Sequence, residues 1–179
     1  MLMSVIRVFL TGEPGCGKTT VIREIVKILN AKGIRSGGMI SGEIRTAGVR
    51  VGFSLEDLMT QQRGILAHID QKEGPSVGKY RVNLADVERV GVAAIRRAID
   101  SADVIVVDEL GPMELHSASF IAAIETALKC PKPILGTIHK RAAHNLVTTI
   151  RSSQTNEIIE VKAENRETLP RVIVEKLAH

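Results

Sequence analysis

The chain has 179 residues, of which 44% are hydrophobic and 25% charged, close to the globular average and far from the composition of disordered proteins. At roughly 150 residues per domain, we expect one compact domain over residues 1–179. Aromatic residues make up only 2%, which predicts an aliphatic core and disfavours, without excluding, a surface that stacks single-stranded nucleic acid. The net charge of +4 suits a polyanionic ligand such as a nucleotide, and equally an ordinary basic surface.

The two cysteines, Cys16 and Cys130, are too few for a disulfide framework and match no zinc spacing, which favours a reducing, cytoplasmic setting. The first ten residues, MLMSVIRVFL, are interrupted by Arg7 and lack a small-residue cleavage site, so we expect a buried strand rather than a signal peptide. No apolar run approaches the roughly 20 residues that cross a bilayer, so no membrane partner is expected. Four histidines share no metal-ligand spacing and are expected to be structural or exposed: His68, His116, His144 and His179.

Apolar runs bounded by turn residues alternate with amphipathic stretches, a pattern typical of a mostly parallel sheet covered by helices on both faces. The spacing predicts a first strand over Val5 to Leu10 and a first helix over Lys18 to Asn30. From Gly37 to Asp70, three short β-like runs separated by turn-prone residues predict an antiparallel ribbon inserted into this α/β frame.

The second half continues the alternation. KEGPSVGKY reads as a loop, after which Asn83 is placed to cap a helix from Leu84 to Asp100. Val104 to Val107 is the most continuously apolar strand. The remaining predicted elements are a helix near Ser117 to Lys129, a strand at Pro133 to His139, a helix near Arg141 to Ile150, a strand at Ile158 to Val161 and a helix from Glu167 to Leu177.

Residues 12–19 satisfy G-x-x-x-x-G-K-[ST], the phosphate-binding (Walker A) loop, between a predicted strand and a predicted helix. Glycines at positions 15 and 17 allow backbone conformations that turn successive N–H groups toward phosphate oxygens, at the positive end of a helix. We expect Lys18 to bridge the β- and γ-phosphates, Thr19 to ligate Mg²⁺ and Thr20 to contact the α-phosphate. The predicted phosphate-binding residues are Gly12, Glu13, Pro14, Gly15, Cys16 (through its N–H), Gly17, Lys18, Thr19 and Thr20.

Two carboxylates end the apolar strand, as in the Walker B motif in its Asp-Glu form. Ligands bind at the carboxyl ends of strands in such sheets, so Asp108 is expected to hold Mg²⁺ and Glu109 to take a proton from the attacking water. Taken alone, the pair would be an ordinary strand exit. Together with the phosphate loop, adjacent carboxylates favour hydrolysis over phosphoryl transfer because a water must be activated.

The strand at Pro133 to His139 ends in Thr-Ile-His, and a polar tip beside the phosphate loop is suited to sense the γ-phosphate or hold the attacking water, which makes Thr137 and His139 candidates. An arginine that neutralises transition-state charge is also expected, although an unpaired arginine is more often a solvated surface residue. Sequence spacing does not choose among five candidates: Arg63, Arg81, Arg141, Arg151 and Arg166.

The chain resembles a known family through segments spread over almost its whole length. They are GEPGCGKTT, GEIR, RVGF, QRGILA, GKYRV, DELGPMEL, ILGTIH and ENRETL. DELGPMEL and ENR, in this order and with the ribbon, are far more specific than the phosphate loop. Together they are similar to the small thermophile-type nucleoside-triphosphatases, whose animal relative is called cancer-related nucleoside-triphosphatase. The resemblance implies a RecA-like core and Mg²⁺-dependent hydrolysis of several nucleoside triphosphates with weak base preference.

The resemblance also carries roles onto individual residues. It implies phosphate binding by residues 12–20, metal binding by Thr19 and Asp108, and water activation by Glu109. Glu114 matches a second acidic position with a supporting role, unless it simply favours a helix N-terminus. Asn165 and Arg166 match a loop near the base, where a capping Asn is the plain alternative. The strand expected to line the nucleotide comprises Val104, Ile105, Val106, Val107, Asp108, Glu109, Leu110 and Gly111.

These observations predict an α/β P-loop NTPase, a RecA-like three-layer sandwich whose parallel strands follow the order 5-1-4-3-2, with the ribbon as a lid or a sheet extension. The expected activity is Mg²⁺-dependent hydrolysis of ATP, GTP, CTP and UTP by a chain for which a monomer is favoured. One alternative is a small-molecule or nucleoside kinase, which needs an acceptor pocket. Another is a nucleotide-dependent switch that needs an RNA or protein partner.

Overall fold

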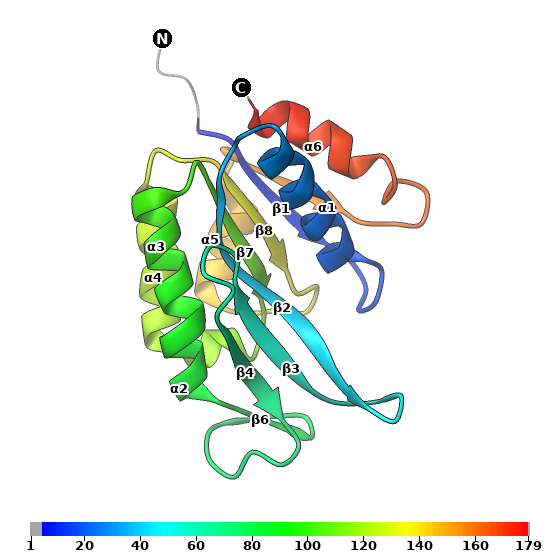
Figure 1. Cartoon of the computed structure of the whole chain (residues 1–179), viewed down its shortest axis with the longest axis vertical. Helices are drawn as coiled ribbons and strands as arrows, with labels where there is room; N and C mark the ends of the chain where they lie inside the picture. The colour runs from blue at the N-terminus through cyan, green and yellow to red at the C-terminus, as the bar shows by residue number, and fades with distance from the viewer. Residues whose placement is uncertain (1–4, 179) are drawn as a thin grey trace.

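The computed structural model describes residues 5–178, in which the strands form a single nine-stranded sheet of order β5-β6-β4-β3-β2-β7-β8-β1-β9 (Figure 1). Residues Met1 to Ser4 of the predicted first strand segment and His179 lie outside the described part. The strands are β1 (Arg7–Thr11), β2 (Ser36–Thr46), β3 (Val49–Asp57), β4 (Arg63–His68), β5 (Ser76–Val77), β6 (Tyr80–Val82), β7 (Val104–Leu110), β8 (Ile134–Ile138) and β9 (Asn156–Glu160).

Five neighbouring strands, β2, β7, β8, β1 and β9, pair in parallel. Counted in chain order, their arrangement across the sheet is 5-1-4-3-2, which confirms the predicted topology. The order places the ends of β7 and β8 beside the end of β1, from which the phosphate loop departs. The carboxyl ends of parallel strands meet at one edge of the sheet, where ligands bind in α/β folds.

The ribbon prediction is confirmed for the antiparallel pairing of β2, β3 and β4, but the ribbon is not a separate insertion. The first part of β2, Ser36–Ile40, pairs in parallel with β7, and the same strand then continues into the ribbon. A Cβ on Gly38 would lie 2.0 Å from the Val106 carbonyl oxygen, so glycine permits this close strand approach. β2 therefore belongs to the central sheet and to the ribbon at once.

The loop prediction for KEGPSVGKY is wrong in part, because the segment contains a hairpin of β5 and β6 turned at Gly78, whose φ of +58° suits glycine. Strands of two and three residues are too short to show a hydrophobic period. This hairpin extends the sheet beyond β4 through pairing of Ala67 with Val82.

The helices are α1 (Lys18–Ala31), α2 (Leu84–Asp86), a π-helical stretch η1 (Val87–Val92), α3 (Ala93–Ser101), a 3₁₀ turn η2 (Glu114–His116), α4 (Ala118–Lys129), α5 (Asn145–Ser152) and α6 (Leu169–Leu177). Asn83 caps α2 as predicted, since its side chain accepts from the Asp86 N–H.

The predicted start of α5 at Arg141 is wrong. His144 caps the helix by accepting from the Leu146 N–H, and the preceding residues form a turn instead.

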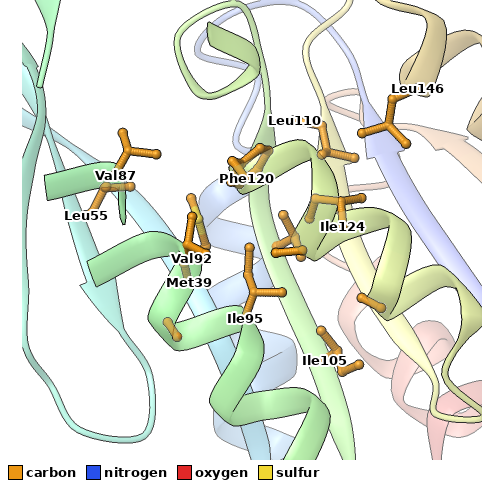
Figure 2. Close-up of a cluster of buried hydrophobic side chains, with 14 of the residues drawn as sticks. Met39, Leu55, Val87, Val92, Ile95, Ile105, Leu110, Phe120, Ile124 and Leu146 are labelled. Carbon is orange, nitrogen blue, oxygen red and sulfur yellow. The ribbon is translucent and has the colours of Figure 1, made fainter. Parts of the chain in front are cut away.

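Helices cover both faces of the sheet, with α1 and α6 on one side and α3 and α4 on the other (Figure 1). The cores are aliphatic, as predicted, and Figure 2 shows one of them, where Met39, Leu55 and Ile105 from the sheet meet helical side chains. Two of those helical side chains are Val92 and Phe120. This is the predicted three-layer α/β architecture. No helix within residues 5–178 is long and apolar enough to cross a membrane.

Candidate functional site

The phosphate-loop sequence connects β1 to α1, as its motif requires. Gly12, Gly15 and Gly17 have φ values of +145°, +77° and +103°, a region that L side chains rarely adopt. A Cβ on Gly12 would also lie 2.8 Å from the Cys16 Sγ and 2.9 Å from the Val161 carbonyl oxygen. The Cys16 N–H donates to the Glu13 carbonyl at 3.1 Å, which closes a turn inside the loop. These glycines are therefore needed by the path of the backbone itself.

Lys18 is folded back over this loop. Its buried Nζ donates to the carbonyl oxygens of Gly12 at 3.2 Å and Glu13 at 3.4 Å, and it lies 3.8 Å from Glu109 Oε2. One cation therefore touches the loop and the end of β7 together. This central position is the one that a bridge between β- and γ-phosphates requires.

Asp108 is 1% exposed, and both of its carboxylate oxygens accept hydrogen bonds from threonine hydroxyls. Thr19 Oγ1, in the first turn of α1, donates at 2.8 Å, and Thr137 Oγ1, on neighbouring strand β8, donates at 2.6 Å. Burial raises the pKa of Asp108, while these hydroxyls and the charge of Lys18 oppose the rise. Thr137, predicted to sense the γ-phosphate or hold water, is thus directed at the Asp108 carboxylate.

The surroundings of Asp108 fit a magnesium ion. A carboxylate and a hydroxyl are hard oxygen donors of the kind that Mg²⁺ prefers, and a divalent cation offsets the cost of burying the charged carboxylate. No cluster of three or more His, Cys, Asp or Glu side chains suited to a metal occurs within residues 5–178.

Glu109 and Glu114 lie on the same side of Gly111. A Cβ on Gly111 would be 3.0 Å from Glu114 Oε2 and 3.3 Å from Glu109 Oε1, so both carboxyl groups converge on one point. Burial raises the pKa of Glu109 to about 7, with Lys18 opposing the rise. Glu114 is 4% exposed, and burial, followed by the charge of Glu109, raises its pKa to about 8. The 3₁₀ turn η2 brings the second carboxyl group to the first.

His139 follows β8 and lies beside the loop. Its backbone N–H donates to the Leu110 carbonyl at 3.1 Å, and this bond joins the ends of β8 and β7. Its Nδ1 accepts from the Arg141 N–H at 3.3 Å, an arrangement that leaves the proton of a neutral ring on Nε2. Burial and then the charge of Lys18 lower the pKa of His139, which favours this neutral form.

The strand predicted to line the nucleotide divides into two parts. The side chains of Val104 and Val106 lie in the core under α1, and those of Ile105, Val107 and Leu110 in the opposite core. Near its end the strand carries the two Walker B carboxylates, of which Asp108 is buried and Glu109 is partly exposed. The apolar part therefore supports the polar tip from below.

The loop between β9 and α6 contains both residues predicted to lie near the base. Asn165 is engaged within its own loop, since Oδ1 accepts from the Lys162 N–H at 2.8 Å and Nδ2 donates to the Glu160 carbonyl at 2.9 Å. Arg166 reaches toward the phosphate loop, because a Cβ on Gly17 would lie 3.9 Å from its Cδ. The loop thus brings the Arg166 side chain, rather than the Asn165 amide, toward the phosphate loop.

Arg63 is not free. It lies 3.6 Å from Glu56, which also lies 3.7 Å from Arg23 on α1. Glu56 and Arg63 share a register row with Ile40 and Asp108, so this cluster lies along the sheet from the Walker B strand.

Sequence reasoning missed Lys140 and Glu56. Lys140 Nζ lies 2.6 Å from Glu13 Oε1 in the phosphate loop and 3.5 Å from Oε1 of Glu160, the last residue of β9. The only signal for Lys140 is its place directly after a predicted strand of the sheet. The sequence contains no signal for Glu56, because its partners, Arg23 and Arg63, lie on two other elements.

Comparisons with known proteins agree with this geometry. A family model described as NTPase matches residues 7–174. The nucleoside-triphosphatase THEP1 of Thermofilum pendens is 42% identical over 94% of this chain and 93% of its own length, and that of Methanosarcina acetivorans is 42% identical over 96% of each.

Two solved structures share the fold. The crystal structure of THEP1 from the hyperthermophile Aquifex aeolicus has a TM-score of 0.85 and 30% identity over 97% of this chain and 100% of its own. The solution structure of a human cancer-related nucleoside triphosphatase has a TM-score of 0.81 and 35% identity over 97% and 98%. These matches confirm the resemblance and the fold class. The chain belongs to the NTPase family, the nucleoside-triphosphatases to which the THEP1 proteins belong.

Proposed function

We propose that this protein is a nucleoside-triphosphatase that hydrolyses nucleoside triphosphates to the diphosphate and phosphate in a Mg²⁺-dependent reaction. The observation that carries the proposal is the convergence of Lys18, Thr19, Asp108 and Glu109, from two separate elements, at the carboxyl edge of the sheet. The family membership supports the same activity.

In this reaction, backbone N–H groups of residues 12–20, other than Pro14, bind the phosphate chain at the positive end of α1. Lys18 releases the carbonyls of its own loop and contacts the β- and γ-phosphates. Thr19 and Asp108 would hold the magnesium ion, which when bound neutralises phosphate charge. Thr137 keeps the Asp108 carboxylate oriented from β8.

Glu109 is the proposed general base. Its pKa of about 7 lies near the working pH of a cytoplasmic enzyme. A base with such a pKa is ionised in a substantial fraction of molecules and is still basic enough to accept a proton. In the attack, the oxygen of water bonds to the γ-phosphorus, the bond from that phosphorus to the bridging oxygen breaks, and the proton of water passes to Glu109. A general base of this kind contributes about 10²- to 10⁴-fold in rate.

The loop between β9 and α6 supports a proposal of broad base specificity. Asn165 is used to hold the loop, and a guanidinium such as Arg166 can stack on any base without reading its edge. We therefore propose ATP, GTP, CTP and UTP as substrates. A cytoplasmic location is proposed because Cys16 and Cys130 are both free thiols.

The test is phosphate release from each of the four triphosphates, with and without Mg²⁺. Glu109→Gln and Lys18→Ala should abolish release, and Glu125→Gln, on the exposed face of α4, is the matched control that should retain it. Wild-type protein that binds nucleotide but releases no phosphate would refute the proposal. Transfer of the phosphoryl group to an added acceptor would then favour the kinase alternative.

A further inference from the structure

The turn formed by residues 139–142, between β8 and α5, is held by one side chain. Arg151, on α5, donates to the carbonyl oxygens of His139 and Lys140 at 3.1 Å each and of Ala142 at 3.3 Å. The Ala142 N–H also donates to the His139 carbonyl at 3.0 Å. A planar guanidinium that makes three such bonds fixes the backbone of the turn.

The turn is fixed at both ends against the candidate site. Lys140 pairs with Glu13 of the phosphate loop at 2.6 Å. The His139 N–H is bonded to the Leu110 carbonyl, directly after the Walker B carboxylates. The residue between Lys140 and Ala142 therefore projects from a rigid backbone that touches both the phosphate loop and the end of β7.

That residue is Arg141, and it shares its surroundings with Lys18. The positive charges of Arg141 and Lys18 both lower the pKa of Glu13, after the larger effect of Lys140, and both lower the pKa of His139, after its burial. Both cations are therefore close enough to the same loop residue and the same imidazole to act on them electrostatically, one from α1 and the other from the turn after β8.

Arg141 also differs from three of the other arginines predicted to neutralise transition-state charge. Arg63 pairs with Glu56, Arg81 donates to the Gly74 carbonyl, and Arg151 is used by the turn. Within residues 5–178, the exposed guanidinium of Arg141 has no hydrogen bond or ion pair, and only its backbone N–H is used. Arg166 is placed toward Gly17, at the start of α1.

We propose that Arg141 is a catalytic residue of the hydrolysis, whose guanidinium contacts the γ-phosphoryl oxygens in the transition state, and that Arg151 is the positioning residue that holds its turn. This inference rests on the proposed function. The guanidinium fork suits a phosphoryl group and remains protonated throughout, while the proton of water goes to Glu109. Because the arginine is supplied by the same chain, turnover needs no partner protein.

The first test is steady-state kinetics with MgATP. Arg141→Ala should lower kcat about 100-fold or more, as loss of a transition-state donor does, with KM changed less than about 3-fold. Arg141→Lys should recover only part of the loss, and added guanidinium ion should partly restore Arg141→Ala. Arg96→Ala, an exposed position on α3, is the control. A kcat of Arg141→Ala within about 3-fold of wild type overturns the assignment.

The second test does not depend on turnover. Binding of ADP, Mg²⁺ and aluminium fluoride, which together mimic the transferring phosphoryl group, should weaken about 100-fold in Arg141→Ala, while affinity for ADP alone stays the same. Equal affinity of both proteins for the fluoride complex overturns the assignment. Wild-type protein that binds the fluoride complex through Arg141 but releases no phosphate would instead refute only the proposed hydrolysis.

The role of Arg151 is tested by a double-mutant cycle. Arg151→Ala alone should lower kcat at least about 10-fold, but in the Arg141→Ala background it should cost little more, because the turn then has no guanidinium to present. A merely structural role would give the same fold-loss in both backgrounds. Equal losses would therefore remove Arg151 from the proposal and leave that of Arg141 to the two tests above.

Discussion

Thr137 and Asp108, 29 residues apart in the chain, are joined by a hydrogen bond of 2.6 Å between the tips of two neighbouring parallel strands. The threonine is fully buried and donates to the carboxylate oxygen that Thr19 leaves free. The Walker B carboxylate is thus oriented before any ligand arrives, from α1 on one side and from β8 on the other.

Replacing Thr137 by valine should therefore impair both stability and metal use. The change keeps the shape but leaves a buried carboxylate oxygen without its donor, which costs about 1–3 kcal/mol of unfolding free energy. We expect urea denaturation to show this loss and the Mg²⁺ concentration for half-maximal phosphate release to rise. Thr137→Ser retains the hydroxyl and should behave like wild type in the Mg²⁺ titration. An unchanged titration for Thr137→Val would contradict the orienting role.

The pH dependence of hydrolysis should report the proposed base. Because Glu109 must be ionised to accept a proton, kcat/KM should rise with pH and level off above a pKa of about 7. The measurement is phosphate release between pH 5.5 and 9 (about two units either side of that pKa) at saturating Mg²⁺. A rate that is flat over this range would be incompatible with Glu109 as the base.

Glu114 should make the folded protein less stable as pH rises. Its folded-state pKa of about 8 is above the ordinary glutamate pKa of 4.5, so the folded state binds more protons than the unfolded state between these values. The stability it contributes is therefore present below pH 4.5 and lost as pH rises through about 8. Glu114→Gln should raise the unfolding free energy at pH 8 by on the order of 4 kcal/mol.

The matched control for Glu114 is Glu125→Gln, an exposed position on α4 that should leave the pH dependence of stability as it is in wild type. Denaturant unfolding at pH 5 and at pH 8 gives the comparison. If wild type and Glu114→Gln lose stability equally between the two values, Glu114 is not buried in a neutral form.

The ribbon should extend the sheet rather than close over the nucleotide. β2 is continuous from its pairing with β7 into the ribbon, and Glu56 lies between Arg23 of α1 and Arg63 of β4. Trypsin cleavage after Arg45 and Arg50, which flank the ribbon turn, should therefore proceed at the same rate with and without MgADP. Protection of these two sites by nucleotide would show that the ribbon acts as a lid.

Local signals predicted the phosphate loop and the alternation of strands and helices. Gly12, Gly15 and Gly17 favour the backbone conformations that the loop adopts, and the motif predicts a strand before the loop and a helix after it. The apolar runs and amphipathic stretches give the period of each element from consecutive residues. The Asp-Glu end of β7 is of the same kind, because the strand that precedes it is visible in four consecutive apolar residues.

Contacts across elements were decided only by the tertiary structure. Thr137 orients Asp108 because β8 lies beside β7, and Glu114 meets Glu109 because η2 folds back past Gly111. α5 likewise begins at Asn145 rather than at Arg141. The cap formed by His144 and the bonds from Arg151 to backbone carbonyls stabilise a turn where hydrophobic periodicity alone predicts helix.

The amino-acid sequence by itself therefore determined which strand and loop ends carry the chemistry, because turn conformation and hydrophobic period are properties of neighbouring residues. Only the tertiary structure decided which side chains face one another there. Register between strands and the packing of helices bring together residues that are far apart in the chain, and free arginines such as Arg141 are distinguished from paired ones such as Arg63 by those contacts alone.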